Sequence, residues 1–178
     1  MLDAQGKLSV LRSQHPVSRV RKGLHRAPNA AYWLARGEQA RAAGDAAQAH
    51  SAFERAITIA PTCAEAHAAL AGMYHHSALQ GPAVLREVGL ARAETHLREA
   101  LCHAPKNGSY WAALATLLVD RGAVVGAATA YHTALARDPA CRAAQQGLAL
   151  LVAVWPELGD LAPAASTALL QYDANARR

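Results

Sequence analysis

Apolar residues recur along the chain in one fixed order of small and large side chains, and each recurrence ends at a proline. The order is alanine, a bulky residue four positions later, alanine after three more, a branched residue beside it, and proline after four more. These intervals place the apolar residues on one face of a helix, and proline ends that helix because its ring cannot continue the hydrogen-bond ladder. The pattern occupies Ala49–Pro61, Ala93–Pro105 and Ala127–Pro139.

A second pattern precedes each of these segments and predicts a partner helix. It places a large residue four positions before a small one, in the pairs Trp33 and Gly37, His67 and Ala71, and Trp111 and Ala115. Small side chains let helix backbones approach closely, while bulky ones fill the remaining space. The small positions expected between helices are Gly37, Ala71, Ala115, Ala49, Ala93, Ala127, Ala56, Ala100 and Ala134. Gly44–Asp45 and Gly122 predict tight turns inside two of the pairs. Because Pro105 and Pro139 lie 34 residues apart, the helix pairs form a repeat.

The two patterns together resemble the tetratricopeptide repeat, whose sequence runs W-x2-L-G-x2-Y, then A-x3-F, then P. The resemblance covers residues 30–139 and implies an all-α, right-handed solenoid of helix–turn–helix units. Such units cannot bury their apolar faces alone, so successive pairs stack into one continuous core. The implied function is a non-enzymatic scaffold or adaptor for protein–protein interaction, which holds a partner peptide or helix in its concave groove.

Three regions divide the chain on this interpretation. Residues 1–28 form a basic N-terminal arm with a degenerate half-repeat, residues 29–139 form three units, and residues 140–178 form a capping helix and a C-terminal tail. The half-repeat is indicated by the spacing of Val20, Gly23, Leu24 and Pro28. The capping helix is expected over Arg142–Trp155, with Leu148, Ala149 and Val152 on one face, because solenoids need their last open face covered. A short helix over Ala164–Tyr172 is expected beyond it.

The second unit is longer than the third. Pro61 and Pro105 are 44 residues apart, ten more than the regular period. Gly81–Pro82 is a strong turn signal, so we expect both helices of this unit to be elongated into a protruding hairpin. Three apolar residues after this turn form either a contact patch or part of a solvated hairpin without a partner; they are Val84, Leu85 and Val88.

The resemblance also implies which residues face the groove, because first-helix positions line the inner surface of tetratricopeptide arrays. The groove residues expected on this basis are Leu34, Glu38, Arg41, Glu65, Ala69, Gly72, His75, His76, Ala113, Thr116, Asp120 and Gln146. Most are small or weakly apolar, which suits an apolar or helical peptide. One subfamily grips acidic chaperone C-termini through Lys, Asn and Arg side chains. That carboxylate clamp is absent, since its positions here hold Leu34, Glu38, Ala69, Ser109 and Ala113.

Basic residues gather in the N-terminal arm, which includes Arg19, Arg21, Lys22 and Arg26. No acidic residue occurs between Asp3 and Glu38, in a chain of net charge +5. Such a segment can contact an anionic surface, but no aromatic residues interleave with these charges to stack nucleic-acid bases. Nucleic-acid binding is therefore the weaker alternative. A third interpretation of the basic arm is an arginine-rich targeting segment. A further alternative is a regulatory or substrate-docking module for a separately encoded enzyme.

Composition favours helices and a single domain. Hydrophobic residues make up 52% of the 178 residues, much of this alanine, and aromatic residues only 5%; no segment alternates in the manner of a strand. The longest apolar run, Leu148–Trp155, has eight residues, far fewer than the ~20 that cross a membrane. No secretory signal is recognisable, so we expect a cytoplasmic protein. Three cysteines, an odd number, indicate buried, unpaired thiols rather than a disulfide framework.

No arrangement in the sequence predicts a metal, a cofactor or catalysis. The nine histidines include the adjacent His75 and His76, whereas chelation on one helix face needs a spacing of three or four residues. Glycine-rich phosphate loops and nucleophile elbows are absent from the sequence. The acidic residues Glu54, Glu94 and Glu99 occupy positions expected to face outward on second helices, where Glu94 can pair with Arg98 at i,i+4. We therefore expect no metal site, no cofactor and no enzyme.

Overall fold

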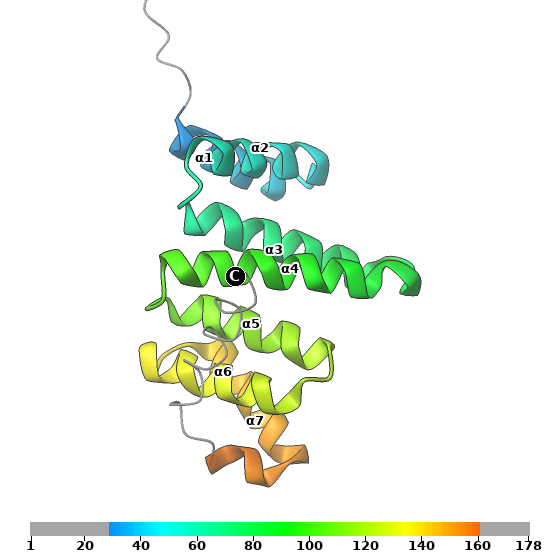
Figure 1. Ribbon diagram of the computed structural model, residues 1–178, viewed down its shortest axis with the longest axis vertical. Coiled ribbons are helices and arrows are strands. Elements are labelled where there is room, and N and C mark those ends of the chain that lie inside the picture. Colours follow the sequence, from blue (N-terminus) through cyan, green and yellow to red (C-terminus); the bar gives the residue numbers. More distant parts are fainter. Residues whose placement is uncertain (1–28, 161–178) are drawn as a thin grey trace, which may run out of the picture.

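The computed structural model describes residues 29–160 of the 178 residues. In this part of the chain every regular element is a helix, and Figure 1 shows the helices stacked in neighbouring pairs along the long axis. The expected all-α solenoid is thereby confirmed. The elements are α1 (Ala30–Ala42) with α2 (Ala46–Ile59), α3 (Ala64–Gln80) with α4 (Ala83–His103), α5 (Gly108–Asp120) with α6 (Val124–Arg137), then α7 (Arg142–Val154) and the 3-10 helix η1 (Pro156–Asp160).

Asparagine N-caps and glycine turns determine where several helices begin and end. The side-chain oxygen of Asn29 accepts a hydrogen bond from the Tyr32 N–H at 2.9 Å, and Asn107 caps α5 in the same way. Gly44 and Gly122 have φ angles of 79° and 75°, a conformation that is costly for a residue with a β-carbon. These glycines therefore close the first and third helix pairs, as the sequence predicts.

Small residues stand where the helices approach most closely, and all nine positions expected from the repeated pattern are buried. At Gly37 the ring of Phe53 lies so near that a β-carbon would overlap it. Phe53 is fully buried and Trp111 is 3% exposed, so both fill space between helices. Trp33 is only half-buried, and the Arg55 guanidinium covers its ring at 4.5 Å from the centroid.

The buried apolar residues form two clusters rather than the expected single core. The smaller cluster joins the first unit to α3 and comprises Ala40, Ala49, Phe53 and Leu70. The larger cluster extends from α3 to η1. Tyr74 of α3 packs against both clusters. The two clusters meet at α3, because Leu70 belongs to the smaller cluster and Ala71 to the larger one.

The hairpin of the second unit is elongated, as its sequence predicts. α3 has 17 residues and α4 has 21, against 13 and 14 in the first unit, and Figure 1 shows both helices extending beyond the neighbouring pairs. Near the free end, Val84, Leu85 and Val88 are 87%, 60% and 52% exposed. The end of the hairpin thus presents apolar side chains to solvent.

Glu94 contradicts its expected outward position. This residue is only 7% exposed, and its carboxylate pairs with Arg98 of the same helix at 2.6 Å and with Arg121, the residue directly after α5. The guanidinium of Arg121 also lies 2.6 Å from the Glu87 carboxylate. The prediction was wrong because it considered one unit alone, whereas the next unit brings a basic side chain over α4.

The capping helix α7 packs through a face that includes two of the three expected residues, Leu148 and Val152, but not Ala149. Its buried residues are Ala144 and Leu151. Leu148 and Val152 are half-buried, but Ala149 is exposed. Three further expectations lie outside the described residues: the basic arm, the half-repeat indicated by the spacing of Val20, Gly23, Leu24 and Pro28, and the helix over Ala164–Tyr172.

The cysteines are unpaired, as expected, but they are not uniformly buried. Cys141 is buried, Cys63 is half-buried and Cys102 is exposed. The expectation of a buried thiol was therefore wrong for Cys102, because its position near the end of α4 faces solvent.

Candidate functional site

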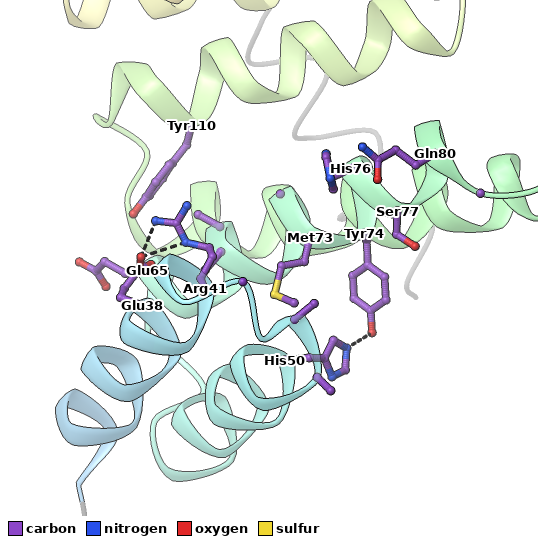
Figure 2. A pocket seen from close by; sticks show the side chains of 17 residues that line it. Glu38, Arg41, His50, Glu65, Met73, Tyr74, His76, Ser77, Gln80 and Tyr110 are labelled. Atoms are coloured by element: carbon purple, nitrogen blue, oxygen red, sulfur yellow. Dashed lines mark hydrogen bonds and ion pairs between the residues drawn. The ribbon is translucent and has the colours of Figure 1, made fainter.

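A hollow of about 1250 Å³ lies between the first helix pair and α3 (Figure 2). Residues of α1, α2, the turn between them, α3 and α5 line it. They are Glu38, Arg41, Gly44, Ala46, Ala47, His50, Glu65, Ala68, Ala69, Gly72, Met73, Tyr74, His76, Ser77, Gln80, Gly81 and Tyr110. The hollow adjoins α3, which contributes residues to both core clusters.

Two features of the sequence create this hollow. Ala68, Ala69 and Gly72 give α3 a floor of small side chains, and the space that a β-carbon of Gly72 would enter is open to at least 4 Å. α3 is also four residues longer than α1, so its last turn, which holds Ser77 and Gln80, stands beyond the end of the first pair (Figure 1). Elongation of the hairpin therefore extends the groove past the regular length of the repeat.

Charged side chains gather at one end of the hollow, where Figure 2 shows Glu38, Arg41 and Glu65 close together. Arg41 donates from Nε and Nη2 to Glu38 Oε2 at 3.0 and 2.5 Å. The other end is polar but uncharged at Ser77 and Gln80. The hollow thus has charged side chains at one end and neutral polar side chains at the other.

Tyr110 of α5 adds a hydroxyl to the charged end (Figure 2). Burial raises the pKa of this phenol, and the Glu65 carboxylate and the Cys63 thiol act in the same direction. Tyr110 is therefore protonated at neutral pH and presents a hydrogen-bond donor beside the carboxylates.

The wall of the hollow between α2 and α3 contains a hydrogen-bonded aromatic pair. His50 Nε2 lies 2.9 Å from the Tyr74 hydroxyl, and the two rings meet edge to face with 5.4 Å between centroids. His50 Nδ1 lies 3.5 Å from the Glu54 carboxylate. This pair connects α2 of the first unit to α3 of the second unit.

A smaller hollow of about 270 Å³ lies between α3 and α5. Its lining residues are Ala68, Ala71, Gly72, His75, Leu97, Ala113 and Thr116. His75 Nε2 lies 2.6 Å from the Asp120 carboxylate, so a polar contact spans the two first helices. Ala68 and Gly72 line both hollows, which places the two on one inner surface.

The structure brings ten of the twelve groove residues expected from the sequence into or beside these hollows. Glu38, Arg41, Glu65, Ala69, Gly72 and His76 line the larger hollow; His75, Ala113 and Thr116 line the smaller one, and Asp120 pairs with His75. Leu34 instead packs against the smaller core cluster, and Gln146 is exposed on α7. Arg19, Arg21, Lys22 and Arg26 of the basic arm lie outside the described residues.

Several lining residues escaped the sequence prediction. Ser77, Gln80 and Gly81 lie beyond the thirteen-residue span of a regular first helix, which only the elongated α3 provides. His50 lies on α2, whereas the prediction considered first helices only, and Tyr74 occupies a position of α3 that was not assigned to the groove.

Within residues 29–160, no group of three or more His, Cys, Asp or Glu side chains is placed to hold a metal ion. Among the helices of the same residues, none is long and apolar enough to span a membrane.

Comparison with known proteins supports the architecture. No protein-family model matches the chain, and no curated protein is significantly similar to it. Among solved structures, a mutant of the Thermobaculum terrenum O-GlcNAc transferase is 27% identical with a TM-score of 0.60, over 69% of this chain and 22% of that enzyme. The TPR domain of Sgt2 from Aspergillus fumigatus is 19% identical with a TM-score of 0.59, over 73% of this chain and 81% of that domain. The chain therefore spans about a fifth of the length of the first of these.

Proposed function

We propose that this chain, a tetratricopeptide-repeat protein, is a non-enzymatic adaptor that binds a helical or extended segment of a partner protein. The observation that carries the proposal is the hollow of about 1250 Å³ between the first unit and α3. It lies on the inner surface that the repeat pattern assigns to the groove. Half of the residues expected there line it.

The size and lining of the hollow favour a protein segment over a small molecule. Small-molecule sites are typically clefts of about 300–1,000 Å³ with a few convergent polar groups. Here the volume is larger, and the floor of Ala68, Ala69 and Gly72 admits the close approach of a backbone. An amphipathic helix that places its apolar face in a groove is an established mode of peptide recognition.

The charges of the hollow argue against an acidic C-terminal partner. Glu38 and Glu65 outnumber the single cation Arg41 among the lining Asp, Glu, Lys and Arg residues. Like charges at an interface cost several kcal/mol. A partner segment that is apolar along the floor and carries a neutral or basic residue near Glu65 fits the surface best.

A second function is favoured by one comparison. The likeness to part of an O-GlcNAc transferase, at 27% identity, supports a role as a docking module that brings a substrate or regulator to a separately encoded enzyme. This role uses the same surface, so the two functions differ in the identity of the bound protein.

Affinity capture from an extract of the native cell tests the proposal. The full-length chain is compared with Ala69→Arg, which fills the floor of the hollow, and with Ala136→Arg, a matched change at an exposed site on α6. We expect the captured proteins to be lost with Ala69→Arg and retained with Ala136→Arg, at unchanged helical content by circular dichroism. Equal capture by all three chains would contradict the proposal.

A further inference from the structure

Four side chains, two in the wall of the larger hollow and two behind it, form a continuous chain across three helices. His50 of α2 contacts the Tyr74 hydroxyl at 2.9 Å. The Tyr74 ring stacks on His96 of α4, with 5.5 Å between centroids and 8° between the ring planes. His96 Nδ1 lies 3.1 Å from His67 Nδ1, and His67 Nε2 lies 3.1 Å from the carbonyl oxygen of Pro61.

The carbonyl of Pro61 fixes which nitrogen of His67 carries the proton. A carbonyl oxygen only accepts hydrogen bonds, so Nε2 of His67 is the donor. Trp111 stands at the equivalent place in the next unit, and its indole N–H, which can only donate, bonds to the Pro105 oxygen at 3.0 Å. Neutral His67 therefore presents a lone pair at Nδ1, and His96 donates to it from Nδ1–H.

This arrangement accepts one additional proton but not two. A proton on Nε2 of His96 leaves its bond to His67 intact. A second proton on His67 Nδ1 would set two N–H groups against each other across 3.1 Å, so the contact must open. Two solvated imidazoles take up protons freely below about pH 6.5. Acid therefore favours the open arrangement over the closed one.

The charges around the pair come from α2, α3 and α4. Burial lowers the pKa of His96, and His67 and His50 act in the same direction, while the carboxylates of Glu99 and Glu54 oppose them. Two further basic groups are close: the ring centroid of His103 lies 6.3 Å from that of His67, and the Arg92 guanidinium lies 5.8 Å from the Tyr74 ring. Geometry and surroundings thus both disfavour a doubly protonated pair.

We propose that this chain of side chains makes the larger hollow sensitive to protons, so that partner binding weakens as the solution becomes acidic. Opening of the contact between His67 and His96 frees Tyr74, whose ring rests on His96. Tyr74 and the His50 that it holds both line the hollow. The inference rests on the function proposed above because it concerns the same surface. For one linked proton the affinity falls by up to about tenfold per pH unit.

NMR spectroscopy of the full-length protein tests the mechanism without a partner. We expect the ring resonances of Tyr74 and His96 to shift together, with a midpoint below about pH 6.5. In His96→Asn the shift of Tyr74 disappears, whereas in the control His76→Asn, which alters an exposed histidine of the same hollow, it persists. A Tyr74 shift that is unchanged in His96→Asn, or absent from the wild type, overturns the proposal. If His96→Asn does not fold, His67→Gln, whose amide can still donate to Pro61, gives the same test.

Capture of partner proteins at about pH 7.5 and 5.5, on either side of the ordinary histidine pKa, separates this inference from the proposed function. We expect weaker capture at the lower pH for the wild type and for His132→Gln, a change at a histidine of α6 that lines neither hollow, and little pH dependence for His96→Asn. Equal capture by the wild type at both pH values overturns the inference and leaves the function standing. Capture that Ala69→Arg does not reduce at either pH overturns the function itself.

Discussion

The guanidinium of Arg121, at the end of α5, pairs with the buried carboxylate of Glu94 in α4. Because Glu94 is only 7% exposed, its charge depends on this contact and on Arg98 for compensation. This ion pair links the second unit to the third. The first and second units are joined through the smaller apolar cluster and the hydrogen bond between His50 and Tyr74.

Replacement of Arg121 by alanine should destabilise the array. The change leaves the Glu94 carboxylate paired with Arg98 and removes the contact between Arg121 and Glu87. A partly uncompensated carboxylate near the protein interior costs about 1–3 kcal/mol, and the partial exposure of Arg121 keeps the loss below that of a fully buried pair. Urea denaturation measures the free energy of unfolding. Arg137→Ala, an exposed arginine on α6, serves as control and should change it by less than about 0.5 kcal/mol.

Replacement of Phe53 by alanine should nearly unfold the first unit. Phe53 is fully buried and fills the space left by Gly37, so its loss costs about 3–5 kcal/mol through lost burial and the remaining cavity. Ile59→Ala on the same helix is the matched control, because Ile59 is 48% exposed. Thermal melts followed by circular dichroism compare the two. Similar melting temperatures for both variants would show that Phe53 does not fill the interface between α1 and α2.

The fold was predictable because the same spacing of small and large residues recurs in three units of the sequence. Each small residue, such as Gly37 or Ala71, stands where two helix backbones approach closely. This approach recurs in every unit, so one sequence pattern identifies all nine small positions. The environment of Glu94 was not predictable in this way. Its burial depends on Arg121, a residue 27 positions later whose placement follows from the length of α5.

The candidate site was predictable only where it follows the regular repeat. Ala69 and Gly72 occupy inner positions that any unit of this kind would expose. Ser77 and Gln80 line the hollow because α3 is longer than a regular first helix. Tyr74 lines it while packing against both core clusters, which the spacing within one unit does not encode. The contact between His67 and His96 joins residues 29 positions apart on helices whose relative orientation no local spacing encodes.

Acid should reduce the stability of the fold through His96. Its pKa is lowered in the folded protein, first by burial and then by His67 and His50, so below about pH 6.5 the unfolded chain binds more protons than the folded one. Stability contributed by the neutral ring is therefore complete above about pH 6.5 and is lost as the pH falls through the window down to the folded pKa. The slope is up to about 1.4 kcal/mol per pH unit for one proton.

Urea denaturation at about pH 7.5 and 5.5 measures this loss. The difference in unfolding free energy between the two pH values should shrink in His96→Asn and persist in His76→Asn, since His76 is exposed. An identical difference in all three proteins would assign the acid sensitivity to other histidines.

Shortening the elongated hairpin should preserve the helical fold while removing part of the lining of the larger hollow. Deletion of Ser77 to Arg86 removes the ten residues by which the second unit exceeds the regular period. The turns of the first and third units each need a glycine with positive φ, so the deletion is combined with Val88→Gly to supply one at the new turn. Because the deleted residues form the last turn of α3, the connection and the first turn of α4 at the free end of the hairpin, the helical content should match that of the wild type in proportion to length.

Partner capture by the shortened chain then distinguishes two roles of the hairpin. The deletion removes Ser77, Gln80 and Gly81 from the lining of the hollow and also removes the apolar end at Val84 and Leu85. The double variant Val84→Ser with Leu85→Ser removes only the apolar end, because neither residue lines the hollow. If the extended groove binds the partner, the deletion should weaken capture and the double variant should not. Loss of capture in both would instead identify the exposed end of the hairpin as the contact, since that end is the one feature both variants lack.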